Sequence, residues 1–119
     1  MLTVLIAARD ARTRDAVRSA LDPAGVHVVA EACGRWHSGE LLRALAPDAA
    51  VVGVSLLCTH DFFLTGWGPV SRDVRILAVG PDDPHLARLL LAHGAAVYVP
   101  VDRLADELPA CLAGSRARV

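Results

Sequence analysis

The chain has 119 residues, a length that suits one domain with a single hydrophobic core. Its formal net charge of -1 provides no basic surface, so we do not expect this domain to contact nucleic acid directly. No apolar run approaches the roughly 20 residues of a membrane span, and Arg9 and Asp10 interrupt the amino-terminal run. We therefore expect a cytoplasmic protein without a signal peptide.

The mean hydropathy of +0.41 is high for a soluble domain and predicts that a partner covers part of the apolar surface. The cysteines Cys33, Cys58 and Cys111 lack CxxC spacing, which favours neither a disulfide framework nor a zinc site. All 12 basic residues are arginine, so any mechanism that requires a lysine ammonium is excluded.

Short apolar runs alternate with segments of helical period, which predicts βα units and a parallel sheet. Residues 3–7 (TVLIA) indicate a first buried strand, and residues 11–21 an amphipathic helix. Residues 26–30 are the second expected strand. Ser38 is the expected N-cap of a helix that runs to Ala46.

Residues 49–54 (AAVVGV) are apolar on both faces, as expected of a central parallel strand. The segment 55–73 has a weak pattern. A helix at 60–64 would be stopped early by the glycines and the proline that follow, so the third helix is expected to be short or irregular. A fourth strand is predicted at 74–79.

An aspartate-capped helix follows and ends at Gly94. The fifth strand is expected at 96–99 and a last helix at 104–113, bent by Pro109. These elements predict an α/β, flavodoxin-like three-layer sandwich with a five-stranded parallel sheet and about five helices. We expect one domain over 1–114, with 115–119 as the start of a linker or tail.

Five segments are informative through their order and spacing. They are Val4-Leu-Ile-Ala, Val29-Ala-Glu-Ala, Leu45-Ala-Pro-Asp, Arg75-Ile-Leu-Ala-Val and Ala92-His-Gly-Ala-Ala-Val-Tyr. Together they resemble the receiver domain of bacterial response regulators, especially the NarL/LuxR-type branch, over essentially the whole chain. The resemblance implies a CheY-like fold, a role in two-component signalling, and DNA binding only through a C-terminal helix-turn-helix that this chain does not contain.

The resemblance also implies where a phosphorylation pocket would lie. The two magnesium-binding acids correspond to Ala8 and Arg9, and the phosphoaccepting aspartate to Gly53. The Ser or Thr that ends strand four corresponds to Gly80, and the lysine after strand five to Val101. The chain departs from the family pattern at every one of these positions.

Phosphoryl transfer to a carboxylate needs a nucleophile, a divalent cation held by oxygen ligands, and positive charge on the phosphoryl oxygens. Gly53 has no side chain, Val101 has no charge, and Arg9 places a cation where the metal would bind. Asp10 alone is a weak ligand set. We therefore expect no catalytic residue, no bound metal and no cofactor.

Two hypotheses concern the emptied pocket. Arg9 either pairs with Asp10 or Asp82 and locks one conformation, or it is simply solvated. Alternatively, a small molecule occupies the space left by the two glycines of the pocket. Tyr98 corresponds to the aromatic residue that moves on activation in working receivers, and without a Ser or Thr at Gly80 we expect it to be fixed inward or outward.

An excess of leucine on the fourth helix favours self-association: Leu86, Leu89 and Leu90 can point inward together, which leaves Leu91 nearest the solvent. The possible dimer face consists of Leu86, Leu90, Leu91, Leu104 and Leu108. A second apolar group either fills the core or contacts a partner. It consists of Phe62, Phe63, Leu64 and Trp67. The possible metal donors His37, Cys58, His60 and Asp61 have no recognised ligand spacing, so no metal site is expected.

The sequence thus predicts a non-enzymatic pseudo-receiver that dimerises without phosphorylation and controls an attached DNA-binding output domain. Two alternatives stay open: a receiver-like module that senses a small molecule, and a stand-alone adaptor that binds another protein.

Overall fold

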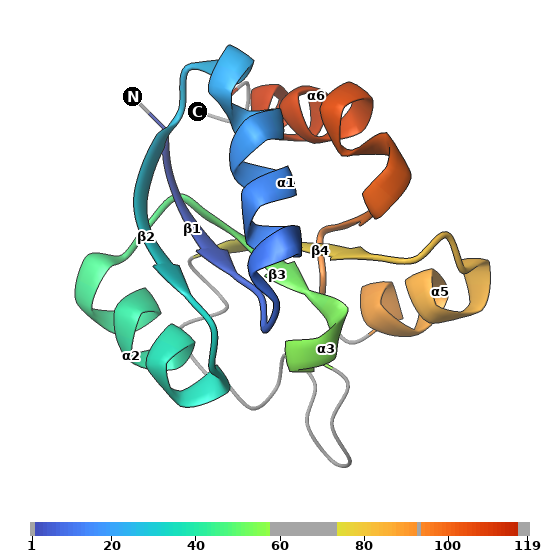
Figure 1. Cartoon of the computed structure of the whole chain (residues 1–119), viewed down its shortest axis with the longest axis horizontal. Helices are drawn as coiled ribbons and strands as arrows, with labels where there is room; N and C mark the ends of the chain where they lie inside the picture. The colour runs from blue at the N-terminus through green and yellow to red at the C-terminus, as the bar shows by residue number, and fades with distance from the viewer. Residues whose placement is uncertain (1, 58–73, 93, 117–119) are drawn as a thin grey trace.

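The computed structural model describes residues 2–57, 74–92 and 94–116 of the chain (Figure 1). One sheet of five parallel strands has the order β2-β1-β3-β4-β5. The strands are β1 (Thr3–Ala7), β2 (His27–Ala32), β3 (Ala49–Gly53), β4 (Arg75–Gly80) and β5 (Val97–Pro100). The α-helices are α1 (Ala11–Leu21), α2 (Arg35–Leu45), α3 (Val54–Leu57), α5 (Pro84–Ala92) and α6 (Leu104–Arg116). Two short 3-10 helices are η1 (Asp22–Ala24) and η3 (Val101–Arg103).

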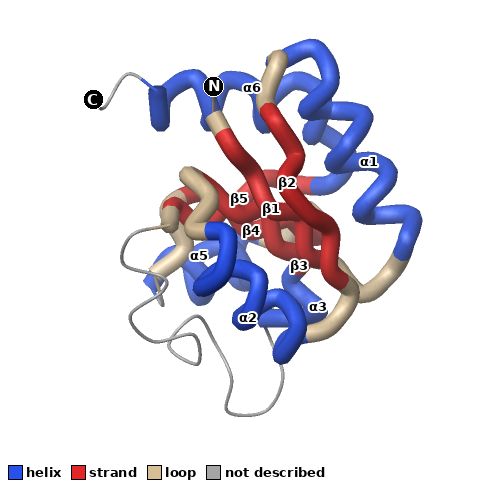
Figure 2. Tube along the Cα trace, turned by 90° about the vertical axis from the view of Figure 1, so that its left-hand side faces the viewer, coloured by secondary structure: helices blue, strands red, loops and turns tan. Residues whose placement is uncertain are grey.

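The helices cover both faces of the sheet, with α1 and α6 on one side and α2, α3 and α5 on the other (Figure 2). Alternate side chains of β1 therefore enter different cores: Val4 and Ile6 pack beneath α1 and α6, whereas Leu5 and Ala7 face the opposite helices. Every residue of β3 is buried, as the apolar run at 49–54 predicted. The predicted flavodoxin-like three-layer sandwich is confirmed.

Asp48 aligns three strands at their amino-terminal edge. Its carboxylate accepts hydrogen bonds from the backbone N–H of Thr3 (2.8 Å) and from the Thr3 hydroxyl (3.1 Å), and its carbonyl accepts from the N–H of Arg75 (3.2 Å). Because the strands are parallel, this alignment also brings their carboxyl ends to one edge. Asp48 itself lies at the far end of β3 from Gly53.

The amino-terminal end of α2 differs from the prediction. The helix begins at Arg35 after Gly34 as N-cap, so the assignment of Ser38 as N-cap is wrong. Ser38 is fully buried, and its hydroxyl donates to the Gly34 carbonyl at 2.6 Å. A serine inside the first turn can satisfy its hydroxyl in this way, so its presence in the sequence does not fix the cap.

The carboxyl-terminal helix α6 runs to Arg116, past the predicted helix end at 113 and the predicted domain end at 114. The third helix is described only as the four residues of α3, and the expected helix at 60–64 lies outside the described residues. Among the helices that the structure describes, none is long and apolar enough to cross a membrane.

Candidate functional site

The positions of the expected pocket lie at the carboxyl edge of the sheet. The register places Gly53 opposite Val79 and Gly80 opposite Pro100, and Ala8 follows β1 directly. In an open parallel sheet this edge is where ligands and reactive groups are held. The structure therefore brings the aligned positions together in space, and their chemistry depends on the side chains present.

Ala8 limits the space for a side chain at Gly53. A Cβ built on Gly53 would lie 3.2 Å from the Cβ of Ala8 and 3.6 Å from its Cα. Both residues are buried, Ala8 with 1% of its surface exposed. Even the first atom of a side chain at position 53 is therefore tightly placed, and neither residue carries a group that could attack phosphorus or bind a metal ion.

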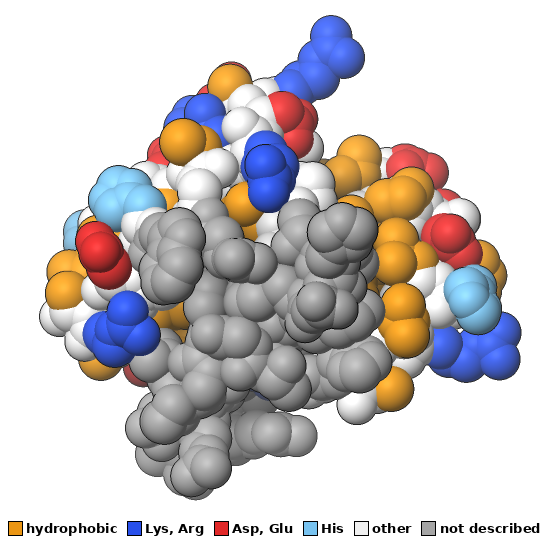
Figure 3. Space-filling view, turned by 90° about the horizontal axis from the view of Figure 1, so that it is seen from below, with side chains coloured by type: hydrophobic (Ala, Val, Ile, Leu, Met, Phe, Trp, Pro, Cys, Tyr) orange, Lys and Arg blue, Asp and Glu red, His pale blue; other side chains and the backbone are white. Residues whose placement is uncertain are grey.

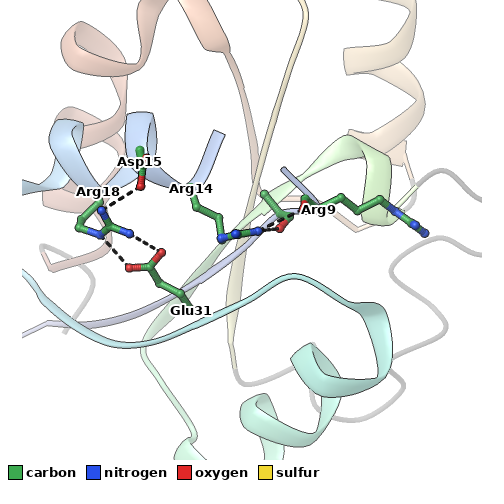
Figure 4. A network of polar contacts seen from close by, with 6 residues as sticks. Arg9, Arg14, Asp15, Arg18 and Glu31 are labelled. Atoms are coloured by element: carbon green, nitrogen blue, oxygen red, sulfur yellow. Dashed lines mark hydrogen bonds and ion pairs between the residues drawn. The ribbon is translucent and has the colours of Figure 1, made fainter. Parts of the chain in front are cut away.

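Arg9 ties the loop after β1 to α3. Its Nε donates to the carbonyl oxygen of Ser55 at 3.1 Å, two residues beyond Gly53 in the chain. The side chain is exposed and extends away from α1 (Figure 4). The Arg9 side chain thus links the loop after β1 to α3, the helix that follows Gly53.

The hypothesis that Arg9 pairs with Asp10 or Asp82 is wrong. Asp82 forms a salt bridge with Arg103 at 3.0 Å. Asp10 caps α1: its carboxylate accepts hydrogen bonds from the hydroxyl of Thr13 (2.9 and 2.8 Å) and from its N–H (3.0 Å). The Thr13 hydroxyl, and then the Thr13 N–H, lower the pKa of Asp10. The acid that follows Arg9 in the chain is thereby committed to a helix cap.

Arg14 is a structural residue of the loop that sequence reasoning missed. Its Nη1 donates to the carbonyl of Ala8 at 2.7 Å and to that of Arg9 at 3.2 Å (Figure 4). Backbone carbonyls in this loop have left the sheet and need partners. The signal in the sequence is a long cationic side chain one turn into the helix that follows the loop.

A separate ion-pair group lies farther along α1. Arg18 forms two 2.7 Å hydrogen bonds with Glu31 of β2 and one of 3.0 Å with Asp15 (Figure 4). Hydrogen bonding by Glu31 raises the pKa of Arg18. This group joins α1 to the edge strand and stands apart from the Gly53 position.

Tyr98 points inward beside Gly80. A Cβ on Gly80 would lie 2.6 Å from the Tyr98 Oη and 2.7 and 2.8 Å from the two γ-carbons of Val54. The Tyr98 hydroxyl donates to the carbonyl of Pro81 at 2.6 Å. Of the two orientations expected for this aromatic residue, the structure adopts the inward one. The volume beside Gly80 is filled by protein atoms.

The expected dimer face needs correction. Leu90, Leu104 and Leu108 are 0%, 4% and 0% exposed and pack in the core, so the prediction that they line a dimer face is wrong. Leu86 packs partly against the core. Leu91 is 44% exposed, as predicted. The other large apolar residues that are exposed in the described part of the chain are Leu45 at 44%, Leu89 at 38% and Val101 at 42%.

Apolar side chains are visible on the side of the molecule where Figure 1 places α5 (Figure 3). Leu90 of α5 is fully buried, whereas the flanking Leu89 and Leu91 are partly in solvent because a helix packed on a sheet buries about one face.

The other residues singled out in the sequence are mostly not tested. The possible donors Cys58, His60 and Asp61 lie outside the described residues, as does the apolar group at 62–67. Within the described residues, no three His, Cys, Asp or Glu side chains are grouped so as to hold a metal ion. Burial raises the pKa of the Cys111 thiol.

The fold is that of response-regulator receiver domains. No family model matches the sequence, and no curated protein matches it. Among solved structures, the signal receiver domain of NarL from Mycobacterium tuberculosis has 24% identity and a TM-score of 0.78 and covers 98% of each chain. At these identities the similarity establishes the fold, and function has to be argued from the residues.

Two RcsB structures are also similar. A Salmonella typhimurium RcsB structure concerned with DNA interaction has 17% identity and a TM-score of 0.81; the match covers 98% of this chain and 60% of that one. RcsB from Salmonella enterica serovar Typhimurium, bound to the promoter rprA in the presence of the phosphomimetic BeF3-, has 18% identity, a TM-score of 0.79 and coverage of 98% and 99%.

Proposed function

We propose that this chain is a phosphorylation-independent receiver-like module of a bacterial transcriptional response regulator. It acts in the cytoplasm by dimerising and by controlling an attached DNA-binding output domain, and it catalyses no reaction itself. The observation that carries this proposal is the small, buried pair Gly53 and Ala8, where a Cβ at position 53 would lie only 3.2 Å from the Cβ of Ala8. The pair lies where the resemblance implies a nucleophile and a metal ligand.

The surrounding residues support the same reading. Formation of an acyl phosphate needs a carboxylate nucleophile and cations around the phosphoryl group. Gly53 supplies no nucleophile, and Val101 stands where the lysine is expected. The positive charge near these positions comes from Arg9 and not from a lysine. Arg9 donates a hydrogen bond to the Ser55 carbonyl, and its charge would repel a metal ion.

The output domain is inferred from the relatives. RcsB is found bound to a promoter, and the chain spans 60% of one RcsB structure. With a formal net charge of -1, this domain has little electrostatic attraction for phosphates, so DNA contact is assigned to a separate domain.

Dimerisation is supported by the exposed apolar side chains on α5. Leu89 and Leu91 are large, apolar and more than one third exposed, and aliphatic side chains of this kind gain free energy when a partner covers them. The small-molecule alternative is less favoured, because Tyr98 and Val54 fill the volume beside Gly80 that such a ligand would need. If the protein is a monomer in solution, the third hypothesis, a stand-alone adaptor that binds another protein, gains support.

The test combines intact-mass spectrometry with sedimentation velocity, over a wide micromolar range of protein, with and without Mg²⁺ and acetyl phosphate. We expect no phosphoryl adduct and a concentration-dependent dimer that is the same under all conditions. A receiver with an intact acidic pocket serves as the positive control for phosphorylation. An adduct on this chain, or assembly that requires the additives, would overturn phosphorylation independence. A monomer throughout would overturn dimerisation.

A further inference from the structure

Tyr98 lies at a junction of three elements. It belongs to β5, where it pairs with Ala78 of β4, and its ring packs partly against the core on the α5 side of the sheet. Its hydroxyl reaches the Pro81 carbonyl in the loop that leads from β4 to α5. The tip of the ring is also beside Val54, the first residue of α3.

The position of the Tyr98 hydroxyl depends on Gly80 having no side chain. A Cβ at position 80 would lie 2.6 Å from that oxygen, which is closer than non-bonded atoms approach. The same Cβ would lie 2.7 and 2.8 Å from the two γ-carbons of Val54. Because Val54 is branched at Cβ and stiff about χ1, it has little freedom to withdraw. The tyrosine hydroxyl would therefore have to shift from its present position.

We propose that Gly80 and Tyr98 form a permanent latch. The phenol occupies the volume of the missing side chain and holds the Pro81 carbonyl, which ties β5 to the loop before α5 in one conformation. The latch rests on the proposed function in one respect: it explains how a module without a phosphoryl group keeps a single regulatory state. The position of the Tyr98 hydroxyl between Gly80 and Pro81 does not depend on the proposed function.

The chain contains one tyrosine, so a tyrosine label reports on the latch alone. Protein labelled with ¹³C at the tyrosine ζ-carbon should give one sharp NMR signal, displaced from that of free tyrosine. A soluble paramagnetic gadolinium chelate should relax this signal less than that of free tyrosine, because the Tyr98 side chain is only partly exposed. Addition of Mg²⁺ and beryllofluoride should leave it unchanged.

Gly80→Ala is the decisive variant. We expect its tyrosine signal to move toward that of free tyrosine and its relaxation by the chelate to increase several-fold. Gly34→Ala is the matched control, because a Cβ at Gly34 meets nothing within 4 Å and the backbone there is extended. It should leave the signal where it is.

A second measurement covers the case in which Gly80→Ala folds poorly. Removal of the hydroxyl by Tyr98→Phe creates room at position 80, so Gly80→Ala should lower the Tm less in the Tyr98→Phe background than in the wild type. Additive changes in Tm would overturn the latch, as would an exposed or averaged wild-type signal. A phosphoryl adduct in the mass experiment would instead refute the proposed function, so the two failures are distinguishable.

Discussion

The Cβ of Ala8 stands 3.2 Å from the point that a Cβ on Gly53 would occupy. The two residues are buried at the ends of neighbouring strands, so each limits what the other can be. In this chain both residues of the pair are small and apolar. A single substitution at either position therefore cannot rebuild an acidic site.

Gly53→Asp should lower the free energy of unfolding by roughly 2–4 kcal/mol, because it places a carboxylate in a tight, buried site that lacks a cation in contact with it. It should still yield no phosphoryl adduct with acetyl phosphate and Mg²⁺. Urea unfolding and intact-mass spectrometry check the two parts. Gly34→Asp is the control: it introduces an aspartate at the N-cap of α2, where the same side chain should be neutral or slightly stabilising. A stable, phosphorylated Gly53→Asp protein would contradict the claim that a single substitution cannot restore phosphorylation.

Arg14→Ala should destabilise the protein by about 1–3 kcal/mol. The substitution removes charged donors from the carbonyls of Ala8 and Arg9, and at least the contact with Ala8 is partly buried. Arg12→Ala, on the exposed side of the same helix, should change the stability by less than about 0.5 kcal/mol. The comparison is made by chemical denaturation at neutral pH. Equal effects of the two substitutions would mean that Arg14 does not organise the loop.

Asp10 predicts a pH dependence of definite sign. Hydrogen bonds from Thr13 lower its pKa below the ordinary value of 3.8, so the folded state binds the proton less readily than the unfolded state. The contribution of the charged cap is complete above the unfolded-state pKa and is lost as the pH falls through the lower, folded-state value. Asp10→Asn keeps a good N-cap without the titration.

The free energy of unfolding of wild type and Asp10→Asn should therefore be compared at pH 7 and at pH 3 and below. As the pH falls, the free energy of unfolding of the wild type should decrease more than that of Asp10→Asn. At neutral pH, Asp10→Ala should lower the free energy of unfolding by about 1 kcal/mol, because it removes the N-cap of α1. Parallel pH profiles for the wild type and the asparagine variant would show that the carboxylate does not titrate with folding.

The strands of the sheet could be predicted because each one is specified by a short segment of the sequence. Each strand is a short apolar run, and the five runs are separated by segments long enough for a crossover helix. The proximity of Ala8 and Gly53 follows from the parallel pairing of β1 with β3, because each residue lies at the carboxyl end of its strand. The partners of Arg9 and Arg14 were not predictable, because they are carbonyls of loop residues whose path the periodicity does not specify.

The burial of leucines on the helices was predicted only in part. The pattern on the fourth predicted helix gave Leu86, Leu89 and Leu90 as an inward set, but only Leu90 is fully buried and Leu89 is 38% exposed. The periodicity of the leucines indicates that the helix has a buried face, whereas the rotation of the helix on the sheet determines which residues at the margins of that face are buried. The same limit explains why Leu104 and Leu108, which belong to the core, were assigned to a surface.

Leu91 and Leu45 provide a matched test of the dimer face, because each is 44% exposed and they lie on different helices, α5 and α2. If α5 forms the interface, Leu91→Asp places a charge in a contact that excludes water and should weaken dimerisation by about 10-fold or more. Leu45→Asp should leave the dissociation constant within about 2-fold of the wild type. Leu89→Asp tests the other flank of α5, since Leu89 and Leu91 lie on opposite sides of the buried Leu90.

Sedimentation velocity over the same protein concentrations distinguishes the outcomes. A loss of dimer with Leu91→Asp alone places the interface on the Leu91 flank, and a loss with Leu89→Asp alone places it on the other. Circular dichroism must show that each variant is folded, because a charge beside the core can also destabilise the helix. If Leu45→Asp weakens the dimer as strongly as the α5 variants do, dimerisation through α5 is contradicted, and the exposed leucines are ordinary surface residues of a kind that most folded proteins carry.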